Sequence, residues 1–236
     1  RFGSTSRRSI YGEGACVYDE NNKKYLDFLS GIAVNALGYN HPAINKTINE
    51  QSKKLIHISN LFYTEPQVRL AEKLCSLSGF DKVFFCNSGA EANELAIKLS
   101  RAKGNTENKT NQSIICMEKS FHGRTIGALS ITKGENFSAK FEPLIEGALF
   151  VPLNDKDTLE KAVTDNTTSI IIEPIQGEGG INIADKSFLE QAKELAHKHN
   201  ALLIFDEIQA GLGRTGTYFA YESANVKPDI ITLAKP

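Results

Sequence analysis

Short apolar runs, separated by longer polar or helix-patterned stretches, dominate the chain from residue 83 onward. The helix pattern is clearest over residues 187–199, and the last two apolar runs contain no alternating polar residues. Unbroken runs of this kind are typical of strands buried on both faces of a parallel sheet. Strands that alternate with helices predict an α/β fold with a mostly parallel sheet flanked by helices. The six runs cover residues 83–86, 114–116, 149–151, 170–172, 202–205 and 230–233.

The first part of the chain has a different pattern. Two strand-like runs around a polar turn in GEGACVYDENNKKYLDFLSG predict a short β-meander. Prolines begin two helical stretches, over residues 43–56 and 66–77, and the polar residues 104–112 are interpreted as a surface loop. We therefore divide the chain into an N-terminal arm with the β-meander (residues 1–40) and a larger domain (residues 41–236).

The composition excludes several classes of partner. The 236 residues are 41% hydrophobic, which is enough for a sizeable core, and 27 basic and 28 acidic residues give a net charge of −1. This balance argues against a nucleic-acid-binding or membrane-surface protein, and no apolar run approaches the roughly 18 residues of a membrane span. We therefore expect neither a nucleic-acid nor a membrane partner.

The cysteines and the first residues bear on the compartment. The four cysteines show neither CxxC spacing nor clustering, so we interpret them as small buried hydrophobic residues in a reducing compartment, and we expect no metal. The first ten residues are rich in Arg and Ser and contain no acid, which fits either the end of a transit segment or a surface arm. The predicted location is the cytoplasm, with the mitochondrial matrix as the alternative.

The candidate chemistry is concentrated at the ends of the last two predicted strands. Asp206 directly follows the run 202–205, and Lys235 comes at the end of the run 230–233. Ligands of open parallel sheets bind beyond the carboxyl ends of the strands, so both side chains are expected there. An amine that forms a Schiff base and an acid that keeps a ring nitrogen protonated suit an aldehyde cofactor with a pyridine ring. Taken singly, the acid also fits a helix cap or a salt bridge, and the lysine fits a solvated position.

Residues 86–93, CNSGAEAN, follow a predicted strand and begin a helix. The turn at Ser88 and Gly89 presents backbone N–H groups and the helix dipole to an anion, which predicts a phosphate site. An ordinary helix N-cap formed by Ser88 and Glu91 explains the same residues, and the sequence leaves both interpretations open.

Two further loops follow predicted strands. In FHGRT, Phe121 is suited to stack on an aromatic cofactor and Arg124 to pair with a carboxylate, although one buried aromatic and one solvated arginine are the simpler interpretation. We assign His122 a structural role. In EPIQGEGG, Glu173 and Glu178 are suited to set the charge near an amine substrate. Two carboxylates also suit a glycosidase or a magnesium site, which nothing else in the sequence supports.

The motifs NSGAEAN, FHGRT, EPIQGEGG, FDEIQAGLGRTG and PDIITLAKP occur in an order and at spacings that resemble the class III (ω-amino-acid) group of pyridoxal-phosphate-dependent aminotransferases. The resemblance extends from Tyr11 to Pro236. It implies the fold-type I large domain of that family, with a mostly parallel sheet and a short N-terminal β segment. It also implies a C-terminal small domain, which we expect to be absent from this chain.

The resemblance implies a role for each motif residue toward the cofactor, pyridoxal 5′-phosphate. Lys235 is implied to carry the cofactor and to shuttle a proton, and Asp206 is implied to pair with the ring nitrogen. The other implied contacts are Phe121 and Ile208 on the two ring faces, Gln209 at the ring hydroxyl, and Ser88, Gly89 and Ala90 at the phosphate.

The resemblance also implies how the substrates bind. Arg124 is implied to bind the substrate carboxylate and Glu178 to pair with an arginine of the C-terminal domain. Glu173 is implied to contact the binding residues rather than the substrate itself. The segments FLSGIAVNALGYNHP and ISNLFYTEPQ resemble members that act on N2-acetylornithine. Ile32 stands where ornithine-specific members carry a tyrosine, and an apolar residue suits an acetylated nitrogen.

The expected reaction moves the δ-amino group of N2-acetylornithine to 2-oxoglutarate. It gives N-acetylglutamate 5-semialdehyde and glutamate, a step of arginine biosynthesis; ornithine, succinylornithine and 4-aminobutyrate are the alternative amines. Members of the family continue past the lysine and form homodimers, so we expect this chain to be an inactive fragment of a longer homodimeric enzyme. The rivals from other classes are a nucleotide-binding dehydrogenase domain, against which the missing GxGxxG turn argues, and a catalytically dead partner.

Overall fold

The computed structural model describes residues 9–133 and 140–235. These residues form two compact units, one that ends at residue 76 and one over residues 77–235. The domain boundary proposed at residue 40 stays a prediction. The first eight residues, on which the choice between a transit segment and a surface arm depends, lie outside the described residues.

The first unit begins with a three-stranded antiparallel sheet, which confirms the predicted β-meander. Asp19 organises the turn between its second and third strands, because the carboxylate accepts hydrogen bonds from the N–H groups of Asn21 and Lys23 and from the hydroxyl of Tyr25. The strands lie side by side in the order β1 (Ser9–Glu13), β2 (Cys16–Asp19) and β3 (Lys24–Leu26).

Three helical segments follow the meander. The first is a distorted turn rather than a regular helix, since Gly31 and Ile32 inside it have φ values of 63° and 68°. The other two confirm the helices predicted at residues 43–56 and 66–77. Their bounds are α1 (Ser30–Ala33), α2 (Pro42–Lys54) and α3 (Glu65–Ser78), the last of which crosses into the second unit.

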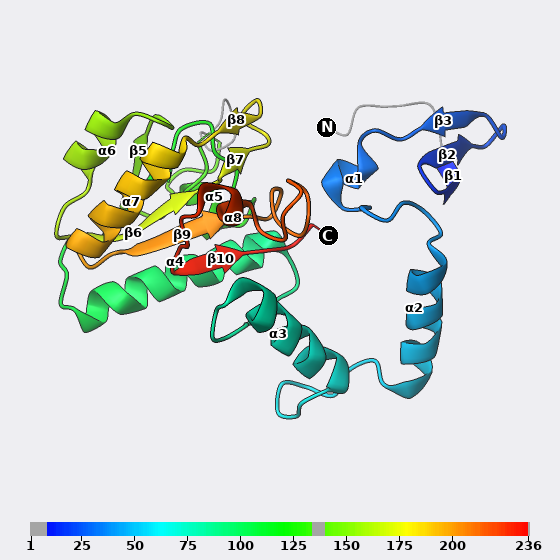
Figure 1. Cartoon of the computed structure of the whole chain (residues 1–236). Coiled ribbons are helices and arrows are strands. Elements are labelled where there is room, and N and C mark those ends of the chain that lie inside the picture. The colour runs from blue at the N-terminus through cyan, green and yellow to red at the C-terminus, as the bar shows by residue number, and fades with distance from the viewer. Residues whose placement is uncertain (1–8, 134–139, 236) are drawn as a thin grey trace. The chain divides into compact units, whose positions relative to one another are not determined.

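The second unit is an α/β domain with a five-stranded parallel sheet, which confirms the predicted fold class. The strand order is β10-β9-β6-β4-β5 (Figure 1). Every residue of β4 and β6 is buried, as expected for inner strands covered on both faces. The strands are β4 (Ser113–Met117), β5 (Ala148–Val151), β6 (Thr167–Ile172), β9 (Leu202–Asp206) and β10 (Ile230–Thr232), and a separate antiparallel pair is formed by β7 (Ile175–Gln176) and β8 (Asn182–Ile183).

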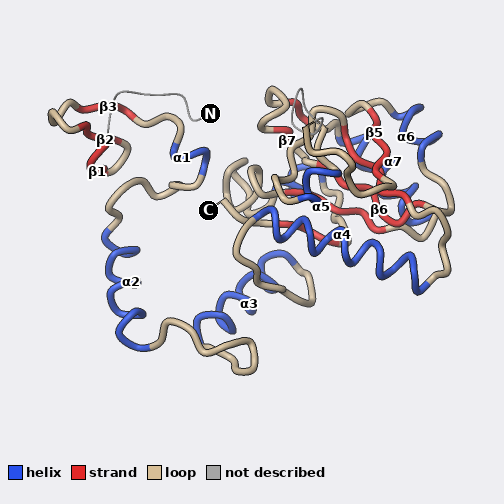
Figure 2. Tube along the Cα trace, turned by 180° about the vertical axis from the view of Figure 1, so that it is seen from behind, coloured by secondary structure: helices blue, strands red, loops and turns tan. Residues whose placement is uncertain are grey.

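Helices cover both faces of this sheet (Figures 1 and 2). On one face, Ala96 and Ile97 pack in a core cluster with Ile114, Ile171 and Ile204 of the strands. On the other face lies the helix that confirms the prediction for residues 187–199. The first face carries α4 (Gly89–Thr106) and α5 (Ile126–Ser130), the second carries α6 (Lys156–Ala162) and α7 (Lys186–Lys198), and α8 (Ala220–Ala224) connects β9 to β10 along the chain.

The strand order fixes where the loops gather. From β4 the chain passes to β5 on one side and then returns to β6 on the other side of β4. Such a reversal is a topological switch point, and ligands of open α/β sheets bind there, at the carboxyl ends of the strands. The loops after β4 and β6, which carry FHGRT and EPIQGEGG, therefore flank the expected ligand site.

The strand predicted at residues 83–86 is not formed. No other segment of the described chain pairs with these residues, and Phe84 is 69% exposed. An apolar run becomes a strand only where a neighbouring strand completes its hydrogen bonds, and periodicity does not report that neighbour. The expectation of buried cysteines is also wrong at Cys86, which is exposed in this segment, whereas Cys16 and Cys116 are buried; all four cysteines are free thiols.

The surface loop predicted at residues 104–112 is partly wrong. The helix α4 continues to Thr106, and the side chain of Lys109 is only 8% exposed. Its Nζ donates hydrogen bonds to the carbonyl oxygens of Thr167 (2.7 Å), His199 (2.7 Å) and Asn200 (3.2 Å). Lys109 thereby ties the segment after α4 to the start of β6 and the end of α7. A polar composition does not distinguish a solvated lysine from one bound to backbone carbonyls.

We predict that Lys109→Ala lowers the free energy of unfolding of the full-length protein by about 2–4 kcal/mol, because charge-assisted hydrogen bonds to three backbone carbonyl groups are lost. Urea unfolding followed by far-ultraviolet circular dichroism measures the change. Lys186→Ala is the matched control: its exposed ion pair with Glu190 predicts a change within about 0.5 kcal/mol. Equal effects of the two substitutions would show that Lys109 behaves as a surface lysine.

Candidate active site

Asp206 lies at the carboxyl end of β9 and is 3% exposed. Its Oδ2 accepts hydrogen bonds from Asn93 (2.8 Å) and from Nδ1 of His122 (2.6 Å), and its Oδ1 accepts one from the N–H of Ile208 (3.0 Å). These partners offset the high cost of burying a carboxylate. A carboxylate has about four acceptor positions, so the described residues leave one position on Oδ1 for a ligand.

His122, which the sequence assigned to a structural role, binds the candidate acid directly. Burial of its fully enclosed side chain disfavours the charged ring, but the hydrogen bond and charge of Asp206 and the charge of Glu173 outweigh burial and raise the pKa of His122. Its Nε2 is buried without a hydrogen-bond partner among the described residues. The ring therefore stays positively charged beside Asp206 to a higher pH than an ordinary histidine would.

Asn93 on α4 was missed by the sequence analysis, which considered NSGAEAN only as a phosphate site. The side chain is completely buried, and its Nδ2 donates to Asp206 and to the carbonyl oxygen of His122 (2.7 Å). Its Oδ1 accepts a hydrogen bond from the hydroxyl of Thr232 (2.9 Å). A signal was present, because Asn93, Ala96 and Ile97 follow the i, i+3, i+4 spacing of one helix face, which places a polar side chain in the core.

The segment before α4 is both an N-cap and a candidate anion site. Ser88 is the N-cap, and its Oγ accepts a hydrogen bond from the N–H of Glu91 (3.2 Å). This bond uses one lone pair and leaves the hydroxyl proton free to donate. The first N–H groups of the helix, at Gly89 and Ala90, have no acceptor within the helix. The two interpretations left open by the sequence are therefore compatible.

Ile208 lies directly against this helix start. A Cβ atom built at Gly89 would lie 2.8 Å from Cδ1 of Ile208, and one built at Gly123 would lie 2.8 Å from Cβ of Ala90. Such distances exclude a larger residue unless the chain shifts. The loops after β4 and β9 therefore both approach the start of α4, and the predicted residues Ala90 and Ile208 come together there.

The loops after β4 and β6 are joined across the switch point. The N–H of Phe121 donates to Oε2 of Glu173 (3.0 Å), and Nε2 of Gln176 donates to the carbonyl oxygen of Glu118 (2.7 Å). Burial raises the pKa of the Glu173 carboxyl to about 8. Glu173 thus holds the backbone of FHGRT in place and is itself almost completely buried, at 3% exposure.

Four further residues predicted to contact substrate or cofactor form two pairs in the loops after β4, β6 and β9. The guanidinium carbon of Arg124 lies 5.9 Å from the ring centroid of Phe121, and Arg124 is exposed. Gln209 donates a hydrogen bond from Nε2 to Oε1 of the exposed Glu178 (3.5 Å). Gln209 also packs on Gly177, where a Cβ would lie 2.6 Å from its Oε1. The structure therefore brings Gln209 to Glu178 and Arg124 to Phe121.

Lys235 is half-buried and follows β10. The strand register pairs Thr232 with Asp206, and Lys235 comes three residues after Thr232. The lysine and the acid therefore follow neighbouring parallel strands at the same edge of the sheet, as the sequence predicted.

Glu207, next to the candidate acid, has a separate task. Its carboxylate accepts hydrogen bonds from the N–H groups of Ala220 (2.7 Å) and Tyr221 (2.8 Å), at the start of α8. Burial raises the pKa of Glu207, and these two hydrogen bonds act against that rise. The residue joins the two ends of the loop 208–219, which carries Ile208 and Gln209.

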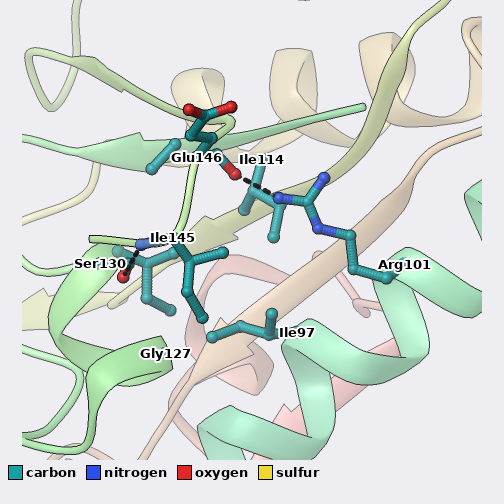
Figure 3. A pocket seen from close by; sticks show the side chains of 9 residues that line it. Ile97, Arg101, Ile114, Gly127, Ser130, Ile145 and Glu146 are labelled. Atoms are coloured by element: carbon teal, nitrogen blue, oxygen red, sulfur yellow. Dashed lines mark hydrogen bonds between the residues drawn. The ribbon is translucent and has the colours of Figure 1, made fainter. Parts of the chain in front are cut away.

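A small cavity lies elsewhere in the second unit, between α4, α5 and residues 145–148 (Figure 3). It is lined mainly by apolar side chains such as Ile97 and Ile145. Arg101 at its edge donates hydrogen bonds to the carbonyl oxygens of Gln112 (2.9 Å) and Glu146. At about 10 Å³ the cavity is large enough for only one water molecule, and none of the candidate site residues lines it.

The described residues offer neither a membrane-spanning helix nor a metal-binding cluster. None of the helices there has the length and apolar character needed to cross a membrane. The same residues contain no group of three or more His, Cys, Asp or Glu side chains arranged to hold a metal ion.

The chain is similar to aminotransferases over almost its whole length. The family model described as aminotransferase class-III matches residues 7–236. The acetylornithine aminotransferase of Methanocaldococcus jannaschii is 50% identical over 227 residues, which cover 96% of this chain and 57% of that protein. The crystal structure of N-acetylornithine aminotransferase from Stenotrophomonas maltophilia matches with a TM-score of 0.85 and 39% identity, covering 99% of this chain and 59% of the other.

A structure of the ornithine aminotransferase from Toxoplasma gondii, with partial occupancy of PLP at its active site, matches with a TM-score of 0.93 and 32% identity. It covers 100% of this chain and 56% of the other. This chain thus spans little more than half the length of its relatives. Because the family model covers residues 7–236, the chain belongs to the aminotransferase class-III family.

Proposed function

We propose that the full-length protein is a pyridoxal-phosphate-dependent aminotransferase that moves the δ-amino group of N2-acetylornithine to 2-oxoglutarate. The observation that carries this proposal is the placement of Asp206 and Lys235 after neighbouring strands, with one acceptor position of Asp206 left by its protein partners. The products are N-acetylglutamate 5-semialdehyde and glutamate, as in arginine biosynthesis.

The residues present fit the cofactor. Ser88, Gly89 and Ala90 would hold the phosphate at the start of α4, where backbone N–H groups and a hydroxyl are available. Oδ1 of Asp206 would accept the hydrogen bond of the ring nitrogen. The remaining contacts would come from Phe121 and Ile208 on the ring faces and Gln209 at the ring hydroxyl. When bound, the cofactor supplies an electron sink that stabilises negative charge at the substrate carbon.

Side chains around the cofactor would transfer the proton and hold the reacting groups in position. The Lys235 amine would carry the cofactor and then take and return the proton of the substrate carbon, since it follows the strand beside Asp206. His122 would hold the Asp206 carboxylate in place through its hydrogen bond to Oδ2, and Asp206 would in turn bind the ring nitrogen. Glu173 would hold Phe121 through its backbone N–H.

The substrate assignment rests on the names of the similar proteins and on the side chains of Arg124, Glu178 and Ile32. Arg124 would pair with the substrate carboxylate through its planar guanidinium. Glu178, which contacts Gln209, would pair with an arginine elsewhere in the full-length enzyme when the amine substrate is bound. The position of Ile32 relative to this site stays a prediction. Ornithine is the main alternative amine, since the Toxoplasma gondii relative acts on it; succinylornithine and 4-aminobutyrate are further alternatives. A homodimer is proposed for the full-length enzyme.

We predict that Lys235 carries the cofactor covalently. Borohydride reduction of the full-length enzyme, followed by peptide mapping, should place the label on Lys235, and Lys235→Ala should abolish transamination because the carrier and proton-transfer group is lost. Lys227→Ala is the control: its amine contacts the carbonyl oxygen of Gly79 and should not affect labelling. Label on any other lysine would contradict the assignment.

Asp206→Asn should retain cofactor binding but lower kcat by about 100-fold or more, because a neutral amide no longer favours a protonated ring nitrogen. Steady-state kinetics and equilibrium dialysis of the cofactor separate the two effects. Asp229→Asn is the matched control on the same strand pair, because Asp229 accepts a hydrogen bond from the N–H of Leu203 at the opposite edge of the sheet. A normal kcat for Asp206→Asn would make Asp206 a structural residue.

Arg124→Lys should raise KM for both N2-acetylornithine and 2-oxoglutarate by roughly 10-fold or more, because each presents a carboxylate to one guanidinium and lysine lacks the bidentate geometry. Arg69→Lys, at an exposed ion pair with Glu65, should leave both KM values unchanged. A change in KM for only one substrate would show that the two do not share Arg124.

A further inference from the structure

We infer that Asn93 is a positioning residue of the proposed aminotransferase reaction: its amide fixes the Asp206 carboxylate and joins it to the strand that leads to Lys235. This inference rests on the proposed function. The juxtaposition that carries it is one buried amide in contact with Asp206, His122 and Thr232 at once. Neither the sequence motifs nor the similar proteins assign this role to Asn93.

The hydrogen-bonding capacity of Asn93 explains why its orientation is unique. Both protons of Nδ2 meet acceptors, namely Oδ2 of Asp206 at 2.8 Å and the carbonyl oxygen of His122 at 2.7 Å. Its Oδ1 faces the hydroxyl of Thr232 at 2.9 Å. Exchanging the amide nitrogen and oxygen would place an acceptor against a carboxylate and a carbonyl group, so only one orientation satisfies all three partners.

The three partners belong to the segments that carry the candidate catalytic groups. Thr232 is paired with Asp206 in the sheet and precedes Lys235 by three residues. His122 lies between Phe121 and Arg124 in the chain. Asn93 itself lies on α4, which begins with the proposed phosphate site. A displacement of this amide therefore changes the relative positions of acid, lysine and ring-stacking loop, and small misplacements of reacting groups have large effects on rate.

Asn93 also determines which carboxylate oxygen remains for a ligand. Asn93 and His122 both bind Oδ2, whereas Oδ1 receives only the N–H of Ile208. Without the amide, Oδ2 loses one of its two partners, and rotation of the carboxylate no longer costs that hydrogen bond. The geometry therefore assigns Oδ1 to the ring nitrogen, and Asn93 acts together with His122 and the N–H of Ile208 to keep the two oxygens from exchanging places.

The test uses full-length enzyme with bound pyridoxal phosphate and the variants Asn93→Ala and Asn93→Asp. The first removes all three contacts, and the second keeps the side-chain shape but replaces the donor group. Ser100→Ala is the matched control, because Ser100 is a buried polar residue on the same helix whose hydroxyl bonds to Ser169 away from the site. Urea unfolding measures stability, and absorbance spectra of the bound cofactor and its dissociation constant are recorded beside kcat and KM.

Both Asn93 variants should lower kcat by about 10–100-fold with little change in KM. The absorbance bands of the bound cofactor should shift in the same direction as in Asp206→Asn. Ser100→Ala should lower the free energy of unfolding but change neither kcat nor the absorbance bands of the bound cofactor. In an Asp206→Asn background, Asn93→Ala should lower kcat by a smaller factor than it does in the wild-type enzyme, because the carboxylate that Asn93 positions is already gone.

The inference is wrong if the kcat losses of Asn93→Ala and Asp206→Asn multiply fully in the double variant. It is also wrong if the cofactor spectra of the Asn93 variants are unchanged. Either result leaves the proposed function intact. An effect of Ser100→Ala equal to that of Asn93→Ala would also overturn it, since general destabilisation would then explain both. If wild-type enzyme binds no pyridoxal phosphate, the proposed function fails and the inference fails with it.

Discussion

A buried carboxylate at the end of a central strand is the constraint on which the rest of this site depends. Asp206 is almost completely enclosed, and a charge in that position is tolerated only if donors surround it. Asn93, His122 and the N–H of Ile208 supply them from three different segments. The requirement to satisfy one carboxylate therefore determines how α4, the loop after β4 and the loop after β9 meet.

Parallel topology explains why those segments are available at one place. All five strands of the large sheet point the same way, so the loops that follow them share an edge. The strand order reverses between β4 and β6, which is where ligands of open α/β sheets bind, and the hydrogen bond from the N–H of Phe121 to Glu173 links the two loops that follow these strands. The fold thus supplies a site, while side chains of the loops decide its chemistry.

Uncharged contacts, in which side chains pack directly on the backbone of glycines, also hold the loops of the site together. Glycines at positions 89, 123 and 177 leave no room for a Cβ, because Ile208, Ala90 and Gln209 already occupy that space. These glycines are visible in the motifs, but their purpose is not, because the partner of each lies many residues away. The same limitation applies to Lys109, whose carbonyl partners come from β6 and from the end of α7.

Local patterns by themselves determined the strands that are buried on both faces, the long helices, and the placement of Asp206 and Lys235 at strand ends. These features follow from spacing along the chain and from the direction of parallel strands. The tertiary structure alone decided which side chains contact each other: Asn93 and His122 reach Asp206 over 113 and 84 residues of sequence. It also decided that residues 83–86 form no strand, because hydrogen-bond partners come from other segments, and periodicity within one segment does not encode them.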